Sequence, residues 1–479
     1  MIAPIIHWFR RDLRLADNPA LAAAATGGAP VIPLYVLDDA TPGRRAVGGA
    51  GRWWLHHSLR SLDGDLRRQG SALVLRRGRA LDAVSRLAEE TGARAVHFTR
   101  GYAPGDAEAE RRLGDTLGAQ GVDCRRFAGS LLVEPEAVRS RSGGPFRVFT
   151  PFYKACRGLR IEAPLPPPSR LAAPMAWPAS DRLEGWGLLP SKPNWSGGLR
   201  ECWKVGEEAA QWRLDAFLDA ALARYAANRD RPAAAGTSRL SPHLSFGEIG
   251  PRDCWHRVTL AAEAGGGGLT AGAETFLREL AWRDFSHHLL HYRPDLAEAP
   301  VRPEFASFPW RDDRPALAAW QRGLTGYPVV DAGMRELWRT GWMHNRVRMI
   351  AASFLVKDLL LPWQAGEAWF WDTLVDADPA SNAANWQWVA GCGADAAPYF
   401  RIFNPTLQGE KFDPEGEYVK RWLPELAGLP AGLVHRPWEA PAAVRAEASV
   451  RLGETYPYPL VDHAWARRRA LEAMARIRH

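Results

Sequence analysis

Short apolar runs alternate with helix-like spans over the first 130 residues of the chain. Four of the runs have the branched and aromatic composition of buried strands: 2–9, 31–37, 72–75 and 95–99. The spans 50–69 and 81–90 between them carry apolar residues at helical spacing. This alternation predicts crossover units and a doubly wound, Rossmann-like parallel sheet, so that residues 1–130 form an α/β domain.

The pattern changes after residue 130. Residues 131–200 contain many prolines and little periodicity, which predicts an interdomain linker that runs over a surface. Beyond residue 201 the strand signal nearly disappears, and the apolar residues within 347–355 follow helical spacing. We therefore expect an all-helical second domain over 201–479, with the glycine run 265–268 as a loop.

Length and composition fit a two-domain globular protein of 479 residues. No apolar stretch reaches the roughly 18 to 20 residues that span a bilayer, and Arg10 and Arg11 interrupt the N-terminus too early for a secretory signal. The five cysteines are scattered with no Cys-x-x-Cys pair, which predicts a cytoplasmic location. A net charge of +7 fits an anionic partner without identifying one.

The most distinctive chemistry lies in residues 376–388. This segment combines Asp376 and Asp378 with the amide of Asn382 and the indoles of Trp386 and Trp388, and it holds no nucleophile or metal-ligand cluster. Most of the 22 tryptophans of the chain must serve packing. The combination nevertheless suggests a site that handles electrons through aromatic rings. An arginine-rich turn, not Gly-x-Gly-x-x-Gly, follows the first strand, so the α/β fold alone supports no NAD site.

Three further segments suit a ligand pocket, and each has a simpler explanation. The hydroxyls and backbone amides of 237–241 suit a phosphate, although such residues more often cap helices. Helical spacing places Glu279, Trp282 and Arg283 on one face, where Glu279 and Arg283 are also an i, i+4 ion pair. The polar residues within 345–349 border an apolar stripe, as a pocket wall or as a solvated helix flank.

Taken together and in order, several motifs resemble the photolyase and cryptochrome family over essentially the whole chain. The motifs are His7–Arg14, Thr237–Ser241, Thr325–Pro328, Trp342–Met349, Asp376–Trp388 and Tyr399–Pro405. The chain looks most like the bacterial photolyases that act on cyclobutane pyrimidine dimers. The resemblance implies an antenna-chromophore α/β domain, an all-α domain that binds FAD in a bent conformation, and UV-damaged DNA as the partner; we expect a monomer.

Carried over position by position, the resemblance implies a set of FAD contacts. They are Tyr225, Thr237, Ser238, Arg239, Leu240, Ser241, Glu279, Arg348, Asp376, Ala377, Asp378 and Asn382. Asn382 falls beside flavin N5, where an amide donates or accepts a hydrogen bond without changing its charge. Plant cryptochromes place an aspartate there, which disfavours the anionic reduced flavin by like-charge repulsion. Asn382 therefore favours repair over signalling.

The resemblance also implies the residues that bind DNA and the lesion. They are Arg229, Trp282, Asn345, Arg346, Met349, Trp388, Arg401 and Gln408. The indole faces of Trp282 and Trp388 suit a flipped pyrimidine pair, and Glu279 would hydrogen-bond the pyrimidine edge or stabilise a protonated radical. Asn345 stands where (6-4) photolyases carry a second histidine. A cyclobutane dimer is thus the expected lesion, and a (6-4) photoproduct is the alternative.

Three tryptophans match the electron relay of the family, in the order Trp386, Trp363 and Trp310 from flavin to surface. An indole can be oxidised and re-reduced without losing its packing, so a series of indoles can connect a buried flavin to an external reductant. Without the resemblance, all three would be read as core residues. Together with Glu279, Asn345 and Asn382, they are the catalytic residues that the resemblance implies.

Some positions depart from the family pattern. Phe276 stands where several bacterial relatives carry tryptophan, and Ala383-Ala384-Asn385 replaces a run richer in amides and glycine. Residues 100–106 lack the Asn-Glu pair of one folate-binding subtype. A second, antenna chromophore is therefore expected, and its identity stays open among a folate, a deazaflavin and other pigments.

The resemblance thus implies a light-driven carbon–carbon lyase with deoxyribodipyrimidine photo-lyase activity. Excited, fully reduced FAD would donate an electron to a flipped cyclobutane dimer, both ring bonds would break, and the electron would return to the flavin. The protein would supply positioning, a dry pocket and electrostatics. One alternative is a cryptochrome-like blue-light photoreceptor, and another is a tryptophan-rich binding module without catalysis.

Overall fold

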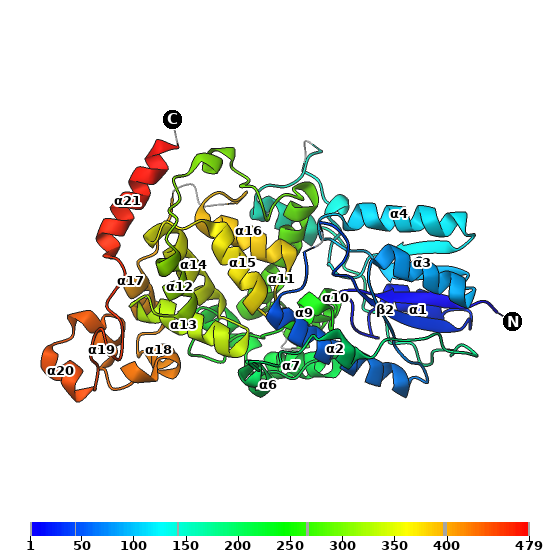
Figure 1. Ribbon diagram of the computed structural model, residues 1–479, viewed down its shortest axis with the longest axis horizontal. Helices are drawn as coiled ribbons and strands as arrows, with labels where there is room; N and C mark the ends of the chain where they lie inside the picture. Colours follow the sequence, from blue (N-terminus) through cyan, green and yellow to red (C-terminus); the bar gives the residue numbers. More distant parts are fainter. Residues whose placement is uncertain (1, 44, 141–142, 265–267, 396–399, 478–479) are drawn as a thin grey trace.

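The computed structural model describes residues 2–43, 45–140, 143–264, 268–395 and 400–477. Tyr399 and residues 265–267 of the predicted glycine loop lie outside the described residues. The chain forms an α/β domain from its N-terminal part and a larger helical domain from its C-terminal half (Figure 1). This division confirms the predicted fold class.

A five-stranded parallel sheet forms the centre of the α/β domain. Its strands are β1 (Ile5–Phe9), β2 (Val31–Leu37), β3 (Val74–Arg77), β4 (Ala95–Thr99) and β5 (Asp123–Phe127), in the order β3-β2-β1-β4-β5. In the central strand Ile5 is aligned with Val31 on one side and with Ala95 on the other. The predicted runs 31–37 and 95–99 coincide with β2 and β4, whereas the run 2–9 begins before β1 and the run 72–75 overlaps only the first half of β3. The edge strand β5 was not predicted, because its sequence, DCRRF, is charged and largely exposed.

Both faces of the sheet are buried, as parallel sheets require. All five residues of β1 are buried. Ile5 and Phe9 share an apolar cluster with α1 (Pro19–Ala25) and α2 (Gly49–Arg68). Ile6 and Trp8 belong to a second cluster with α3 (Ala80–Thr91) and α4 (Asp106–Ala119). The alternating side chains of one strand therefore hold the two helical layers.

The segment that follows the sheet runs along the α/β domain and returns to the helices. It contains α5 (Phe149–Arg157) and the short 3-10 helices η1 (Pro135–Ala137) and η2 (Leu183–Trp186). Its backbone bonds directly to the sheet, since the N–H of Val31 donates to Ala172 O at 2.8 Å and the N–H of Asp181 donates to Leu75 O at 2.9 Å. These bonds attach the proline-rich stretch to the strands.

The rest of the chain folds as packed helices. The α-helices are α6 (Gly197–Cys202), α7 (Glu207–Ala220), α8 (Tyr225–Asn228), α9 (Ser241–Phe246), α10 (Pro251–Ala264), α11 (Ala271–Tyr292), α12 (Arg314–Arg322), α13 (Pro328–Thr340), α14 (Asn345–Ser353), α15 (Trp363–Thr373), α16 (Pro379–Ala390), α17 (Pro405–Phe412), α18 (Glu417–Trp422), α19 (Ala431–Val434), α20 (Ala442–Glu447) and α21 (His463–Arg476). Shorter helical turns are η3 (Leu222–Arg224), η4 (Pro303–Ser307), η6 (Pro424–Leu426), η7 (Pro437–Glu439) and the π-helical turn η5 (Phe354–Asp358).

Every strand of the described residues lies in the α/β domain. Among the described residues beyond 200, the only β-type pairing is an isolated bridge between Leu452 and Tyr456. The helices pack instead around an apolar cluster that contains the buried side chains of α13, α14, α15 and η5. No helix in the described part of the chain has the length and apolar content needed to cross a membrane.

Candidate active site

A cavity of about 490 Å³ opens in the helical domain, where α11, α14, α15 and α16 pack together. Most of the residues expected to bind a cofactor or DNA line it, and they come from distant parts of the chain. They are Arg229, Ser241, Glu279, Trp282, Asn345, Arg346, Arg348, Met349, Asp376, Ala377, Asp378, Asn382 and Trp388, and the expected relay residue Trp386 lines the cavity as well. Arg283, Ser286, Ser381 and Asn385 also line this cavity.

One end of the cavity is formed by the N-terminus of α16. Asp378 caps this helix, since its carboxylate accepts from the N–H groups of Ala380 at 3.1 Å and Ser381 at 2.6 Å. Its other oxygen lies 3.4 Å from Nε2 of His287. Burial alone would raise the pKa of Asp378, but His287, Arg283 and the helix N–H groups outweigh it and hold the pKa far below its usual range. The cap is therefore a fixed negative charge.

A second carboxylate, Asp376, is held by a two-pronged ion pair. The guanidinium of Arg348 donates to its two oxygens at 3.1 and 2.7 Å. The Nε of Arg348 also donates to the carbonyl of Met343 at 2.7 Å, so three bonds fix the arginine. Planar pairs of this kind combine charge with directional bonding. Asp376 is largely buried, with 8% of its surface exposed, and the ion pair with Arg348 compensates its charge and fixes its position.

The amide of Asn382 has a defined orientation. Its Nδ2 group donates to the carbonyl of Glu367 at 3.0 Å and to Oε1 of the same residue at 2.7 Å. An amide nitrogen has only two N–H donors, and both are used here. The side-chain oxygen of Asn382 is therefore the atom left for a ligand in the cavity.

The segment 237–241 lies beside the cavity, and only Ser241 lines it. The guanidinium of Arg239 lies 4.4 Å from the ring centre of Trp342, and the indole N–H of Trp342 donates to Ser241 Oγ at 3.2 Å. Arg239 has a left-handed backbone with φ of 53°, which turns the chain into α9. Leu240 is buried in an apolar cluster with Tyr225. Phosphate and ribitol contacts by Tyr225, Thr237, Ser238 and Leu240 stay a prediction.

His344 sets the start of α14 and so the position of Asn345. Its Nδ1 accepts from the backbone N–H of Arg346 at 3.2 Å, which caps the helix. Burial lowers the pKa of His344 to about 4, and the nearby cations Arg348 and Arg346 act in the same direction. The imidazole is therefore neutral near pH 7. Asn345, the first residue of the helix, lines the cavity.

The mouth of the cavity combines an ion pair with aromatic rings. Arg229 bonds Glu279 and lies over the ring of Tyr225 at 5.6 Å. The i, i+4 pair predicted between Glu279 and Arg283 is not present, because Arg283 turns away and donates to Ser130 O at 2.7 Å. Arg229, which directly follows α8, thus takes the place of Arg283 as the partner of Glu279.

Trp282 is half covered at this mouth. Phe149 of α5 stacks on it, with ring centres 3.6 Å apart and planes 8° apart. Trp282 and Trp388 both line the cavity, as does Met349, whose sulfur lies 3.9 Å from a guanidinium nitrogen of Arg346. One indole face of Trp282 is therefore left for stacking.

Two DNA candidates lie in a neighbouring groove. Arg401 and Gln408 line a groove of about 680 Å³ that shares Arg346 with the main cavity. Lys411 of α17 and Arg467 of α21 line the groove too. Among its described lining residues, Asp230 is the one acidic residue. A basic groove beside the mouth suits a phosphate backbone. Sequence reasoning missed Arg467 because it was assigned to a solvated helix end.

The three candidate relay tryptophans belong to one apolar cluster. Trp386 and Trp363 are 2% and 1% exposed, while Trp310 is partly buried and packs on Phe308 at 4.3 Å. The ring of Trp386 lies 5.0 Å from that of Phe370. The indole N–H of Trp386 has no hydrogen-bond partner among the described residues. Their order as an electron relay stays a prediction.

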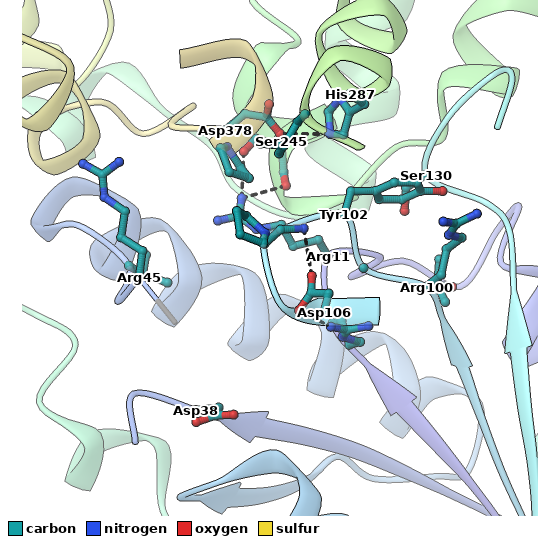
Figure 2. A pocket seen from close by; sticks show the side chains of 18 of the residues that line it. Arg11, Asp38, Arg45, Arg100, Tyr102, Asp106, Ser130, Ser245, His287 and Asp378 are labelled. Carbon is teal, nitrogen blue, oxygen red and sulfur yellow. Dashed lines mark hydrogen bonds and ion pairs between the residues drawn. The ribbon is translucent and has the colours of Figure 1, made fainter. Parts of the chain in front are cut away.

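A second cavity, of about 220 Å³, lies between the carboxyl ends of the strands and the helical domain. Figure 2 shows Arg11, Arg45, Arg100 and Tyr102 around it, with His287 and Asp378 on the helical side. The hydroxyl of Tyr102 donates to Glu134 at 2.7 Å. Ligands of doubly wound sheets bind at this edge. Asp378 and His287 border this cavity while Asp378 also lines the first, so the two cavities share a wall.

Family comparisons account for both domains. The model for the FAD binding domain of DNA photolyase matches residues 276–476, and the DNA photolyase model matches residues 5–169. The chain is 50% identical to the deoxyribodipyrimidine photo-lyase of Agrobacterium fabrum, over 99% of this chain and 98% of that protein. The chain belongs to the DNA photolyase family.

Its relatives include both photolyases and cryptochromes. The crystal structure of a bacterial class III photolyase from Agrobacterium tumefaciens superposes with a TM-score of 0.96 and 50% identity, covering 100% of this chain and 98% of that one. Cryptochrome-1 of Arabidopsis thaliana is 41% identical, over 98% of this chain and 70% of that protein. The Agrobacterium photolyase is thus more similar to this chain than the plant cryptochrome is, which agrees with the expected resemblance to bacterial photolyases.

The main cavity fits FAD, the cofactor of this family's helical domain. A buried donor without a partner is rare in folded proteins, and the unpartnered indole N–H of Trp386 belongs to a residue that lines the cavity. The cavity also presents a carboxamide oxygen at Asn382 and fixed charges at Arg348, Asp376 and Asp378. These groups suit a planar, hydrogen-bonding ring system with a charged tail.

Proposed function

We propose that this chain is a light-dependent enzyme that splits cyclobutane pyrimidine dimers in DNA, with FAD bound in the main cavity. The main support is that one cavity is lined both by the polar side chains of Arg348, Asp376 and Asn382 and by the indole rings of Trp282 and Trp388. When bound and reduced, FAD would supply the electron that opens the dimer under light.

The residues of the chain would position the two reactants. Asp376, Asp378 and Asn382 would hold the isoalloxazine and adenine edges, while Arg239 would neutralise charge on the diphosphate and Ser241 would donate a hydrogen bond to it. A flipped pyrimidine pair would stack on the free face of Trp282 and on Trp388, each base contributing roughly 1–3 kcal/mol. Glu279, held by Arg229, and Asn345 would hydrogen-bond the pyrimidine edges. Arg346, Arg401 and Gln408 would contact phosphates beside the lesion.

Asn382 supports repair over photoreception. Its carbonyl oxygen is the group that the cavity presents, and it carries no charge to oppose a negatively charged reduced flavin. Asn345 of the mouth supports a cyclobutane dimer over a (6-4) photoproduct, since it gives the pocket an amide instead of a second histidine.

A second chromophore would occupy the cavity between the domains. The position at the carboxyl edge of the sheet, the ring of Tyr102 and the surrounding arginines suit a planar anionic pigment. Substituting Ala103→Trp fills this cavity and should remove any absorption band additional to that of FAD, while repair by chemically reduced enzyme persists. If the additional band remains, the pigment binds elsewhere.

Repair itself is tested with defined lesions. The purified protein, reduced and loaded with FAD, is mixed with oligonucleotides that carry one cyclobutane dimer or one (6-4) photoproduct, in light and in the dark. We expect loss of the cyclobutane dimer in light only. Equal loss of the (6-4) lesion would contradict the assigned specificity, and failure of the protein to bind FAD would favour a binding module. All five cysteines are free thiols, which fits a location in the reducing cytoplasm. The expected monomer would be tested separately, by analytical ultracentrifugation.

A further inference from the structure

A chain of bonds leads from the amide of Asn382 to the α/β domain. Behind Asn382 lies Glu367 of α15, whose side chain is 5% exposed. Arg45, in the loop between β2 and α2, donates to the two oxygens of Glu367 at 2.6 and 2.9 Å. Arg45 and Glu367 are 322 positions apart, so this pair joins the two domains directly behind the main cavity.

The loop that carries Arg45 is tightly fixed to α15. The guanidinium lies 4.3 Å from the ring centre of Trp371, and the indole N–H of Trp371 donates to Ala46 O at 2.8 Å. The N–H of Gly49 donates to Asp372 at 2.8 Å. A side chain at Gly48 would collide with the backbone of Trp371 and Asp372, since an added Cβ would lie 2.6 Å from Asp372 Cα. The backbone beside Arg45 is therefore held against α15, and the Arg45 side chain, 39% exposed, lies between Trp371 and Glu367.

The charge of Glu367 dictates which way the Asn382 amide faces. An ionised carboxylate only accepts hydrogen bonds, so it attracts the amide N–H groups and repels the amide oxygen. A buried carboxylate also needs a counter-ion, because an unpaired charge in the interior is costly. Arg45 supplies that counter-ion with the planar, two-pronged geometry that lysine lacks. With this pair in place, the Asn382 oxygen points away from Glu367.

We propose that Arg45 is a positioning residue for the reaction, which holds the Asn382 carbonyl toward flavin N5 through Glu367. The proposal rests on the proposed function, because it needs FAD in the main cavity with N5 beside Asn382. A carbonyl oxygen accepts from the N–H that N5 carries in the reduced flavin and opposes the lone pair that N5 carries in the oxidised flavin. Arg45 thus favours the reduced cofactor that repair requires.

The test is a double-mutant cycle on the midpoint potential of bound FAD, measured by spectroelectrochemistry in the dark. We expect Arg45→Gln to lower the potential by the equivalent of a tenfold shift in the two-electron equilibrium, about 30 mV. In an Asn382→Ala background the same substitution should change little, because the group it orients is gone. The matched control is Arg52→Gln, which removes another arginine of the α/β domain, paired with Asp39 at 2.8 Å.

Each outcome of the cycle decides a different point. An equal fall in both backgrounds would mean that Arg45 acts by its charge alone, and would overturn the proposal. An unchanged potential in Asn382→Ala itself would show that FAD N5 is not beside Asn382, which contradicts the cofactor placement in the proposed function. If Arg45→Gln does not retain FAD, the cycle is run with Arg45→Lys, which keeps the charge and loses the two-pronged contact. If Arg45→Lys lowers the midpoint potential of FAD equally in the wild type and in Asn382→Ala, the proposal is contradicted as well.

Discussion

Gly366 of α15 is the position where one methyl group should disturb the site most. An added Cβ would lie 2.5 Å from Cζ3 of Trp386 and 2.6 Å from Cδ2 of Leu355, and closer still to Cη2 of the same indole. The ring of Trp386 is confined on other sides by Phe370 at 5.0 Å and Trp320 at 6.2 Å. Gly366→Ala therefore forces a rigid ring, not a flexible side-chain end, to move.

Two opposing effects set the magnitude. Alanine is favoured over glycine inside a helix by about 1 kcal/mol. Overpacking a close-packed core costs about 1–3 kcal/mol. Several contacts below 3.0 Å place this site toward the upper part of that range, so the net loss of stability should be about 1–2 kcal/mol. The displaced Trp386 should also slow light-driven reduction of oxidised FAD.

The assay compares Gly366→Ala with Gly114→Ala, a substitution in the interior of α4. A Cβ at Gly114 meets nothing within 4 Å, so alanine there should stabilise the protein by roughly 0.5–1 kcal/mol. Urea unfolding gives the stability difference, and illumination of oxidised protein with an external reductant gives the reduction rate. If Gly366→Ala is as stable as Gly114→Ala and is photoreduced at the normal rate, the packing argument for Trp386 is refuted.

Three further changes test separate parts of the site. Trp282→Ala should weaken binding to dimer-containing DNA by about 1–3 kcal/mol while FAD stays bound, and unchanged affinity in a gel-shift titration would reject its stacking role. Trp386→Phe should block photoreduction of oxidised FAD yet spare repair by chemically reduced enzyme, whereas normal photoreduction would remove Trp386 from the relay. His344 stays neutral in the folded protein down to its pKa of about 4, while the unfolded chain takes up a proton below about pH 6.5. Stability should therefore fall from pH 6.5 to 4 by up to roughly 3 kcal/mol more in the wild type than in His344→Asn, and parallel urea profiles would contradict this assignment.

The sequence was most informative where burial leaves a periodic pattern. The strands β1, β2 and β4 are buried and mostly apolar, and β3 begins with two buried apolar residues, so these runs could be recognised, because both faces of a parallel sheet are covered. The edge strand β5 gave no such pattern. Its Asp123, Arg125 and Arg126 face solvent, and only pairing with β4 makes it a strand.

The candidate site could be predicted only in part from the sequence. Asp376, Asp378 and Asn382 stood out as one dense segment, and the family resemblance gave their roles. The groups that hold Asn382 could not be predicted from the sequence, since Glu367 bonds its amide and Arg45 contacts Glu367 only in the folded structure of both domains. Tertiary contacts also override local ones, as when Arg229 replaces Arg283 as the partner of Glu279.

The most direct measurement is a single-turnover repair experiment on the complex of reduced, FAD-loaded protein with an oligonucleotide that carries one cyclobutane dimer. Blue light is given without added reductant, and restored thymines and the flavin spectrum are recorded together. The account predicts that the dimers are split in light, none in the dark, and that FAD ends in its reduced form. Intact dimers under illumination, with FAD reduced and the DNA bound, would contradict it.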